Sequence, residues 1–472
     1  MFGRKLVTMA TTKEDFLKDP IGELKENLSH AISTFNENVE KIKELHKMYL
    51  GQQNIFEKNR YDASAINNKI VENHIFKQVN FKVGFMYGNP IEYTVTNESK
   101  INSDDLTYLN TYFNDVGKAS LDISKAQDLY EFGIAYQLLI PKRTEIENIA
   151  SESPFELYNL DVEKTCIIYS NDTIKQPLCG LIKGQKKVEG LVRDIYSIYF
   201  ENTRLDFDSV GNLVATYEKQ PYNYIPIQEF WLNKDRIGII EPIISLQDFV
   251  NKLDSLELDE IEENINSFIA FFNQRVDDDF LNKVSELKKQ RVLVLNSNNP
   301  SFPADIKMLS SKLDHSSVNQ LKEMILKAMY DIVSVPQASG NVTSGGDTGQ
   351  ARILGNGWES AQNVAQLDQT FLTQYERNLL KNILWICKNT AKCPINELYA
   401  SDIAIKYNIN MSNNLLVKSE SLKMLNDISF PEKQALNIVG LTNDIDGVGD
   451  AWIQRKKQNQ AEEQQDNNTN NI

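Results

Sequence analysis

The sequence predicts an α+β protein in which long helices flank a central region of short strands. Apolar residues recur at helical spacing through much of the first 130 residues and again from residue 245 onward. Between these regions lie short runs rich in Ile, Val, Tyr and Phe, separated by Asn, Asp, Gly and Pro, which is typical of strands joined by turns. The composition is globular, with 41% hydrophobic and 24% charged residues, and 472 residues allow two or three domains.

The N-terminal region is predicted to be mainly helical. One apolar stripe with helical spacing predicts a first helix, and Gly51 stands where it would end. The stripe consists of Leu24, Leu28, Ile32, Phe35, Val39, Ile42, Leu45 and Met48. A second helix is expected over about Ala63–Tyr87, because a glycine and a proline follow it as stop signals. A strand at Ile91–Val95 and a helix over about Ser120–Tyr130 complete this region.

The central region is predicted to form antiparallel strands within a mixed domain. Its strand candidates combine high β propensity with flanking residues that favour turns. These candidates are Phe132–Ile140, Thr165–Tyr169, Leu178–Ile182, Asp194–Phe200, Leu213–Tyr217 and Ile227–Trp231. The middle of the chain is therefore expected to be its β-rich part.

Two helices, Ser245–Phe272 and Ser317–Val335, are predicted around a short excursion. Each begins with a serine that is followed three residues later by Asp or Gln, a helix-capping pattern. Arg291–Leu295 and Asp305–Leu309 are expected to be short strands of the excursion. Pro336 ends the second helix, because proline disfavours helical geometry in the residue before it.

A loop of small residues, Pro336–Gln350, separates these helices from a much longer helical pattern. The pattern extends over about 40 residues, and Gly355 and Gly357 predict a late start or a kink in it. A smaller helical region follows Pro394. The residues from about Arg455 onward have no hydrophobic pattern and are expected to be disordered.

Charge and cysteine content exclude several classes of protein. The formal net charge is −15, whereas proteins that grip DNA through its phosphates usually have a basic surplus or a dense basic patch. No C-x-x-C pair occurs among the four cysteines, so neither a zinc site nor a disulfide framework is predicted. No apolar run approaches the roughly 18 residues of a membrane span, and no signal peptide is recognised.

The sequence offers no motif for catalysis or for a cofactor. The four histidines fall in no metal-ligand spacing, so no metal is expected; they are His30, His46, His74 and His315. The glycine-rich loop is not a Walker A motif. Gly345 is followed by Gly346 and Asp347 where that motif needs lysine, and an aspartate there would repel phosphate.

Two acidic clusters each allow two interpretations. The run Asp277, Asp278 and Asp279 could bind a cation, but a solvated turn or a partner-facing rim explains it better. The second cluster lies on the predicted first helix of the pair and consists of Asp254, Glu257, Asp259, Glu260, Glu262 and Glu263. It could be catalytic, but no histidine or metal signature accompanies it, which favours a solvated or lumen-facing helix surface.

Five segments follow one another in an order that is more specific than any one of them. They are KMYLGQQNI at Lys47–Ile55, the stretch Asn67–Tyr93 with VNFKVGFMYGNPIEY, LYEFGIAYQLL at Leu129–Leu139, Ile225–Phe230 followed by Ile239–Leu256, and VPQASGNVTSGGDTGQARI at Val335–Ile353. This series resembles the portal proteins of tailed bacteriophages, particularly the type found in siphophages of Gram-positive hosts. The resemblance covers about Lys47–Lys392, and the segment between the two predicted helices is short for the family, so its domain is expected to be reduced.

The resemblance implies a portal-type subunit with an α/β wing, a helical stem, a small β-containing clip, a long wing helix and a helical crown. The implied boundaries are residues 1–237 for the wing, 238–274 for a stem helix, 275–312 for the clip, 313–335 for a second stem helix, 336–350 for a tunnel loop, 351–392 for the long wing helix, 393–454 for the crown and 455–472 for a disordered tail.

A function follows from the resemblance in the same way. The family forms dodecameric rings at one vertex of the capsid, which act as the channel for DNA packaging and ejection. The expected partners are further copies of the chain, the terminase large subunit, major capsid and scaffolding proteins, head-completion or adaptor proteins, and double-stranded DNA bound weakly and without sequence preference. Such a protein is assembled in the host cytoplasm, resides in the virion and is not an enzyme.

Contact with DNA would then fall on the tunnel loop. A ring of twelve copies would have a formal charge of about −180, so its wall would not hold phosphates. The small polar residues of the loop can bond weakly to phosphate or sugar, and its glycines let it change shape. The predicted DNA-facing residues are Gln337, Ser339, Gly340, Asn341, Val342, Thr343, Ser344, Gly345, Gly346 and Asp347. Asp254, Glu257, Glu260 and Glu263 are candidates for an acidic lumen or stem face, and Asp277–Asp279 for a partner-facing rim of the clip.

Two other functions remain open from the sequence. A helical scaffold or adaptor protein of virion assembly, which never contacts DNA, would explain the long helices and the acidity but not the ordered segments. A hydrolase or nuclease with an acidic site would require metal-dependent activity that is lost on mutation of Glu262 or Asp278.

Overall fold

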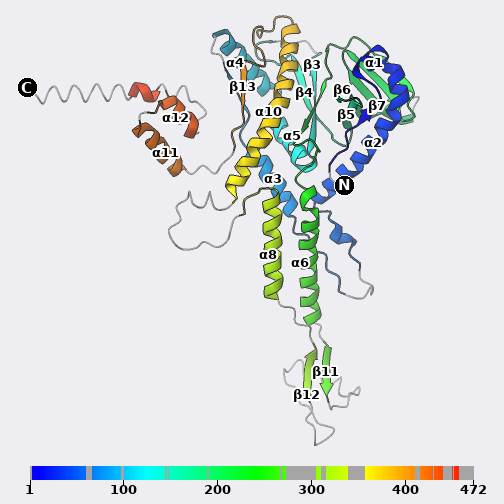
Figure 1. Cartoon of the computed structure of the whole chain (residues 1–472), viewed down its shortest axis with the longest axis vertical. Helices are drawn as coiled ribbons and strands as arrows, with labels where there is room; N and C mark the ends of the chain where they lie inside the picture. Colours follow the sequence, from blue (N-terminus) through cyan, green and yellow to red (C-terminus); the bar gives the residue numbers. More distant parts are fainter. Residues whose placement is uncertain are drawn as a thin grey trace, which may run out of the picture. The chain divides into compact units, whose positions relative to one another are not determined.

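The computed structural model (Figure 1) describes most of the chain. The chain divides into two compact units. The described residues are 3–59, 66–96, 100–143, 146, 148–188, 191–265, 268–272, 305–309, 315–337, 357–409, 415–428, 430–439, 449 and 451–455. Unit 1 comprises Met1–Asn80, Gln127–Ile140 and Tyr158–Val333, and unit 2 comprises Phe81–Ala126, Pro141–Leu157 and Ser334–Ile472. The predicted wing, residues 1–237, is thus divided between the two units.

Unit 1 begins with a short strand and two helices, β1 (Thr8–Met9), α1 (Lys13–Lys18) and α2 (Pro20–Tyr49). Asp19 caps α2 with its side chain, and the proline in the first position has a backbone angle that suits a helix start. The chain leaves α2 through Gly51, whose φ of +83° lies in the left-handed region that favours glycine. The predicted first helix and its stop are confirmed.

α1 and α2 pack on one face of a six-stranded sheet with the order β1–β5–β6–β7–β8–β9 (Figure 1). β1 is parallel to β5, and the other neighbours are antiparallel. The strands are β5 (Thr165–Ser170), β6 (Pro177–Val188), β7 (Leu191–Phe200), β8 (Thr203–Asp208) and β9 (Leu213–Tyr217). The core that they share with the helices includes Phe16, Leu24, Leu28, Phe35, Ile168, Ile198 and Phe207. The first part of the predicted stripe on α2, from Leu24 to Val39, therefore faces the sheet.

A second sheet has the order β10–β3–β4, with β3 (Ile134–Pro141), β4 (Phe155–Leu160) and β10 (Ile227–Trp231). β3 and β10 are antiparallel. The predicted antiparallel, β-rich middle of the chain is confirmed, but β4 and β8 were missed. Both have polar residues at several positions, which weakened the Ile, Val, Tyr and Phe pattern on which the prediction rested.

Two helices and a strand pair follow the sheets: α6 (Ile244–Ile265), β11 (Phe268–Phe272), β12 (Asp305–Leu309) and α8 (His315–Ile332). The predicted stem helix through Phe272 is wrong at its end, because α6 stops at Ile265 and FIAFF pairs antiparallel with β12. A short apolar run fits a buried strand and a buried helix equally well by its periodicity. The predicted strand Asp305–Leu309 is confirmed, whereas Arg291–Leu295 lies outside the described residues.

Three helix starts also differ from the prediction. Ser245 and Ser317 lie inside α6 and α8, so neither is the capping residue. A short 3-10 turn, η2 (Glu241–Ile243), leads directly into α6. The predicted second helix begins later than expected, since α3 is His74–Tyr87 and residues 66–73 are not helical. Residues 66–73 stay extended because side chains of α6 bind their backbone N–H groups.

Unit 2 combines helices with one two-stranded sheet, in which β2 and β13 are antiparallel. Its elements are β2 (Glu92–Val95), α4 (Lys100–Asp115), α10 (Trp358–Asn389), β13 (Ile403–Lys406), α11 (Leu415–Asp427) and α12 (Glu432–Val439), together with the end of α3, the start of α5 (Lys118–Phe132) and the start of β4. Gly357, with φ of +82°, directly precedes α10. The late start predicted from the glycines is therefore confirmed.

Four buried charges join α5 to α10 inside unit 2. Lys118 Nζ lies 2.9 Å from Asp122 Oδ2 and 2.7 Å from Glu376 Oε1. Lys125 Nζ lies 2.7 Å from Asp122 Oδ1 and 3.4 Å from Glu376 Oε2, and Tyr93 of β2 donates to Glu376 at 2.8 Å. Every buried charge in this cluster thus has opposite charges beside it, which is the condition for burying ions at tolerable cost.

Candidate functional site

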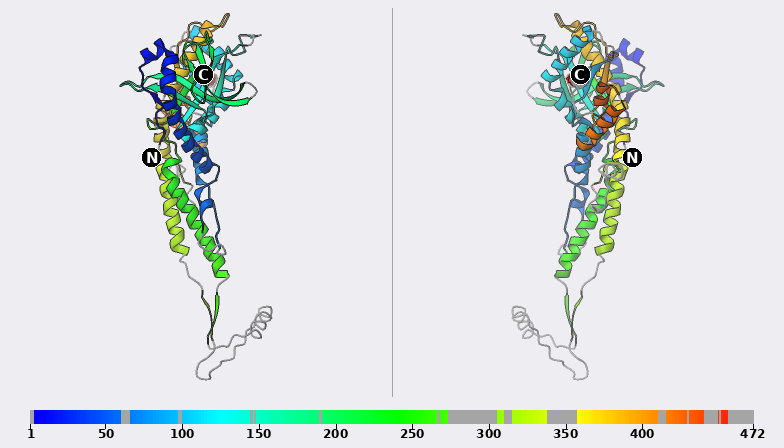
Figure 2. Two further views of the ribbon diagram at one scale, coloured as in Figure 1. Left: turned by 90° about the vertical axis from the view of Figure 1, so that its right-hand side faces the viewer. Right: turned by 90° about the vertical axis from the view of Figure 1, so that its left-hand side faces the viewer.

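α6 and α8, called the stem pair below, lie side by side and run in opposite directions (Figures 1 and 2). Two polar contacts between side chains fix their register. Lys322 Nζ lies 2.7 Å from Asp254 Oδ1, and His315 Nδ1 lies 3.0 Å from Glu257 Oε1. Val250 of α6 is fully buried.

Lys322 also connects the stem pair to the extended segment that precedes α3. Its Nζ lies 2.8 Å from Glu72 Oε2. Partial burial acts to lower the pKa of Lys322, but its hydrogen bonds to Asp254 and Glu72 outweigh this effect and raise that pKa. Beside it, His74 Nδ1 lies 3.1 Å from Tyr330 OH, and burial lowers the pKa of His74, which favours a neutral ring at neutral pH.

A row of four buried polar side chains on α6 binds the same extended segment. We call it the polar ladder; it consists of Gln247, Asn251, Ser255 and Asp259, one helical turn apart. Each of the four accepts a hydrogen bond from one backbone N–H of segment 66–74, and the four donors are alternate residues of that segment. The donor–acceptor pairs are Asn68 N to Asp259 Oδ1 at 2.6 Å, Ile70 N to Ser255 Oγ at 2.9 Å, Glu72 N to Asn251 Oδ1 at 3.2 Å and His74 N to Gln247 Oε1 at 3.2 Å.

The polar ladder works because two repeat lengths nearly coincide. Four residues of an α-helix rise about 6.0 Å, and two residues of an extended chain rise about 6.6 Å. Side chains at every fourth helical position can therefore accept from every second N–H, as a neighbouring strand would. Residues 66–73 are not helical because these donors are already used by α6.

Further bonds close the polar ladder at both ends. Gln247 Nε2 donates to the carbonyl oxygen of Glu72 at 2.7 Å, and Asn251 donates to Gln53 Oε1. At the far end Lys58 Nζ lies 2.7 Å from Asp259 Oδ2. Asp259 is therefore not part of a solvated acidic surface, and the interpretation of the whole acidic cluster as such a surface is wrong for this residue.

The four residues predicted to form an acidic lumen or stem face have different surroundings. Asp254 and Glu257 point to α8, where Lys322 pairs with Asp254 and the ring of His315 contacts Glu257. Glu260 is half-buried, and the side chain of Glu263 lies outside the described residues. Whether any of these carboxylates faces a channel stays a prediction.

The two ends of the predicted tunnel loop lie next to each other in unit 2. Ser334 Oγ and Ser360 Oγ are 3.0 Å apart, and Gly357 lies beside Pro336. The segment between them therefore leaves and returns at one place. Gln337 is half-buried, whereas the predicted DNA-facing residues Ser339–Asp347 and the acidic run Asp277–Asp279 lie outside the described residues.

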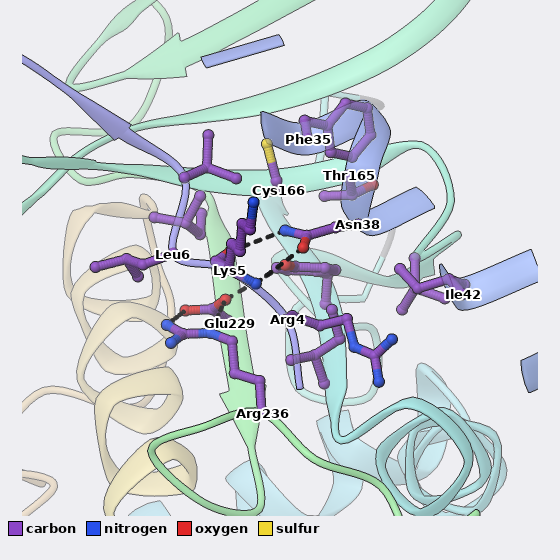
Figure 3. A pocket seen from close by; sticks show the side chains of 15 residues that line it. Arg4, Lys5, Leu6, Phe35, Asn38, Ile42, Thr165, Cys166, Glu229 and Arg236 are labelled. Atoms are coloured by element: carbon purple, nitrogen blue, oxygen red, sulfur yellow. Dashed lines mark hydrogen bonds and ion pairs between the residues drawn. The ribbon is translucent and has the colours of Figure 1, made fainter. Parts of the chain in front are cut away.

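A small cavity in unit 1 is lined by charged groups that already have partners (Figure 3). Arg236 Nη2 donates to Glu229 Oε2 at 3.1 Å, and Tyr169 OH donates to the same carboxylate. Asn38 bonds both backbone atoms of Lys5, accepting from its N at 2.9 Å and donating to its O at 2.8 Å. The cavity volume of about 20 Å³ admits roughly one water molecule and no substrate.

The part of the chain that the structure describes has neither a metal site nor a membrane-spanning helix. No three His, Cys, Asp or Glu side chains come together there in a way that could hold a metal ion. None of the described helices is long and apolar enough to cross a bilayer. The four cysteines are buried and form no disulfide.

The family comparison decides what kind of protein this is. A family model described as phage portal protein, SPP1 Gp6-like, matches residues 28–469. The chain belongs to this portal family. As a portal protein it is a structural component of the virion at the capsid vertex. The portal resemblance and the α+β class predicted from the sequence are confirmed.

Solved structures of gene transfer agent particles contain chains that are similar to this portal chain. The virion of a native gene transfer agent particle contains a chain with 12% identity and a TM-score of 0.42, covering 78% of this chain and 89% of that one. A chain in the neck of the empty particle has 13% identity and a TM-score of 0.45, and the match covers 78% of this chain and 90% of that one. A chain in the neck of the native particle, computed with twelvefold symmetry, has 12% identity and a TM-score of 0.44, and the match covers 78% of this chain and 89% of that one. A search of curated proteins finds no match.

The polar ladder is the part of this portal subunit that sequence reasoning missed. Its signal was present, since the three uncharged polar residues Gln247, Asn251 and Ser255, at every fourth position of an otherwise amphipathic helix, are unusual on a water-facing surface. The carboxylates around it drew attention instead. The sequence also contained a signal for the buried charges of unit 2. Lys118, Asp122 and Lys125 are spaced by four and three residues, which places them on one face of a helix.

Proposed function

We propose that this portal protein assembles into a closed ring of twelve copies that conducts double-stranded DNA during packaging and ejection. The observation that carries the proposal is the stem pair. It is a rigid rod of two antiparallel helices, joined to the rest of unit 1 by the polar ladder and ending in the strands β11 and β12. Repeated around one axis, such rods form the wall of a channel.

In this proposal the ring has no enzymatic step of its own and docks the proteins that act on it. The terminase large subunit supplies ATP hydrolysis, and capsid, scaffolding and head-completion proteins bind around the ring. The net charge of −15 per copy keeps the wall from holding phosphates. Contact with DNA falls on the segment between Pro336 and Gly357, whose ends are held together at Ser334 and Ser360.

Native mass spectrometry and negative-stain microscopy of the purified protein test the ring. We expect a single ring stoichiometry with a central hole wide enough for a duplex. A protein that stays monomeric under all assembly conditions contradicts the proposal. A ring without such a hole favours the alternative of an adaptor that does not contact DNA.

A loop variant tests the contact with DNA. Deletion of Gly340–Asp347 is expected to leave rings intact but to impair DNA packaging or retention, measured as DNA per particle. The matched control replaces the same eight residues by a glycine–serine segment of equal length, which retains pliancy and is expected to package normally. Normal packaging by the deletion variant removes the loop from the mechanism.

A further inference from the structure

The stem pair has two exposed apolar stripes that its own helices do not use. On α8, Leu321, Met324, Ala328 and Ile332 lie along one side; Met324 is 70% exposed and Ile332 53%. On α6, Phe249 and Leu256 lie two turns apart, and each is 41% exposed. Exposed apolar side chains that share one face of a helix are a feature of surfaces that associate with other proteins.

The remaining faces of the two helices are accounted for. α6 turns one face to α8 and a second face, the polar ladder, to segment 66–74, which leaves the side with Phe249 and Leu256. α8 turns one face to α6, and its exposed positions outside the stripe include the polar residues Asn319, Glu323 and Lys327. Each helix thus has one apolar face without a cover among the described residues.

The two stripes lie at matching heights along the stem pair. The ion pair at Asp254 marks one height on both helices. With a rise of 1.5 Å per residue, Leu256 lies about 3 Å and Leu321 about 1.5 Å from this mark, both toward β11 and β12. In the other direction, Phe249 lies about 7.5 Å and Ala328 about 9 Å from it. A large ring at Phe249 is therefore level with a small side chain at Ala328.

We propose that the α8 stripe of one copy packs on the α6 stripe of the next copy. The proposal rests on the ring proposed above. With the stem pair parallel to the ring axis, rotation about that axis keeps every residue at its own height, so Leu256 meets Leu321 and Phe249 meets Ala328 of the neighbour. Two unlike patches that fit each other are what a head-to-tail contact requires, whereas a two-fold dimer needs one patch that fits itself.

Disulfide trapping tests this seam. The double variant Leu256→Cys with Leu321→Cys is oxidised and run on a denaturing gel without reductant. A disulfide needs Cβ atoms about 3.5–4.5 Å apart, and the native cysteines are buried, so only a true contact is trapped. We expect a ladder of bands up to the full ring. A mixture of the two single variants is expected to give dimers only, because each junction then ends the chain of links.

The matched control pairs Leu256→Cys with Glu323→Cys, which is exposed on α8 but outside the stripe. It is expected to stay monomeric on the gel. Rings seen by native mass spectrometry without trapping above this control overturn the seam and leave the ring standing, whereas absence of rings overturns the proposed function itself. Dimers from Leu321→Cys alone indicate a two-fold contact, and a disulfide within one copy indicates that the chain covers its own stripe; both overturn the seam.

A charge introduced into the seam gives an independent readout. Ala328→Glu is expected to reduce the ring fraction at least tenfold, because the carboxylate would be buried against Phe249 of the neighbour. Asn319→Glu, on the polar part of α8, is expected to keep the wild-type ring fraction. Circular dichroism and thermal unfolding of the Ala328→Glu subunit establish that it is folded, and intact rings in that folded variant overturn the proposal.

Discussion

The two ends of α5 bury charge in opposite ways. At the start of the helix, Lys118 and Lys125 face Glu376. Burial acts to raise the pKa of Glu376, but these two cations outweigh it and lower that pKa to about 2. At the end of the helix, Glu131 is also buried but has His46 as its partner, with His46 Nδ1 2.7 Å from its Oε1. Burial raises the pKa of Glu131 to about 7 in spite of this imidazole.

The difference teaches that the number of fixed cations, rather than burial, decides whether an interior carboxylate stays ionised. Two lysines more than offset the loss of hydration at Glu376. Asp128 follows the pattern of Glu131, because burial raises its pKa to about 7 and its charged neighbours are the acidic Glu131 and Asp161. One end of α5 is therefore held by charge at all ordinary pH values, and the other depends on protonation.

The largest effect is expected at the fully charged end. Glu376→Gln keeps the shape of the side chain but leaves two buried lysines with Asp122 as their remaining anion. Breaking a buried ion pair in this way typically costs about 3–5 kcal/mol. Chemical denaturation should show the loss, with Glu359→Gln on the exposed first turn of α10 as the control. Equal stability of the two variants would contradict the importance of the cluster.

The protonation-dependent end is tested by Glu131→Gln. Because the folded pKa of about 7 lies above the ordinary value of 4.5, this group contributes stability below pH 4.5 that is lost as the pH rises through 7. Between pH 4.5 and 7, the contribution of Glu131 to the free energy of unfolding therefore falls by roughly 3 kcal/mol. The variant should lack this part of the slope, so its stability relative to wild type rises with pH. Thermal unfolding between pH 4 and 8 checks this, with the exposed Glu44→Gln as the control; parallel curves would refute it.

A third way of burying polar groups, without net charge, is tested at the polar ladder. Asn251→Ala removes the acceptor of the Glu72 amide and a donor to Gln53. Leaving such groups buried and unpaired costs about 1–3 kcal/mol. Hydrogen exchange at the Glu72 amide should accelerate, and Lys252→Ala on the exposed neighbouring position should not change it. Unchanged protection in Asn251→Ala would mean that the segment is held by its ends alone.

Much of the fold could be predicted because its signals are local. The stripe on α2, the stop at Gly51 and the late start of α10 at Gly357 each follow from residues within a few positions. The end of α6 could not be predicted, because FIAFF becomes a strand only through its pairing with β12, more than 30 residues away. Segment 66–73 was assigned to a helix for the same reason, since the acceptors that hold it extended lie on α6.

The candidate site was less predictable than the fold. The sequence located the stem pair, which is rich in acidic residues. Three of these acids, Asp254, Glu257 and Asp259, have structural partners within the chain. A carboxylate on a helix looks the same in sequence whether water, a lysine or a backbone amide faces it. Only the tertiary structure distinguishes these, because each partner of these acids comes from another element of the chain.

The pitch match of the polar ladder constrains how related chains can vary in length. One residue inserted into segment 66–74 would turn its N–H groups away from α6, since successive groups of an extended chain point in opposite directions. Two residues inserted there, together with four in α6 between Gln247 and Asp259, would add one rung and keep the others. Insertions and deletions at these two places should therefore occur together among portal subunits with this device, in a ratio of two residues to four.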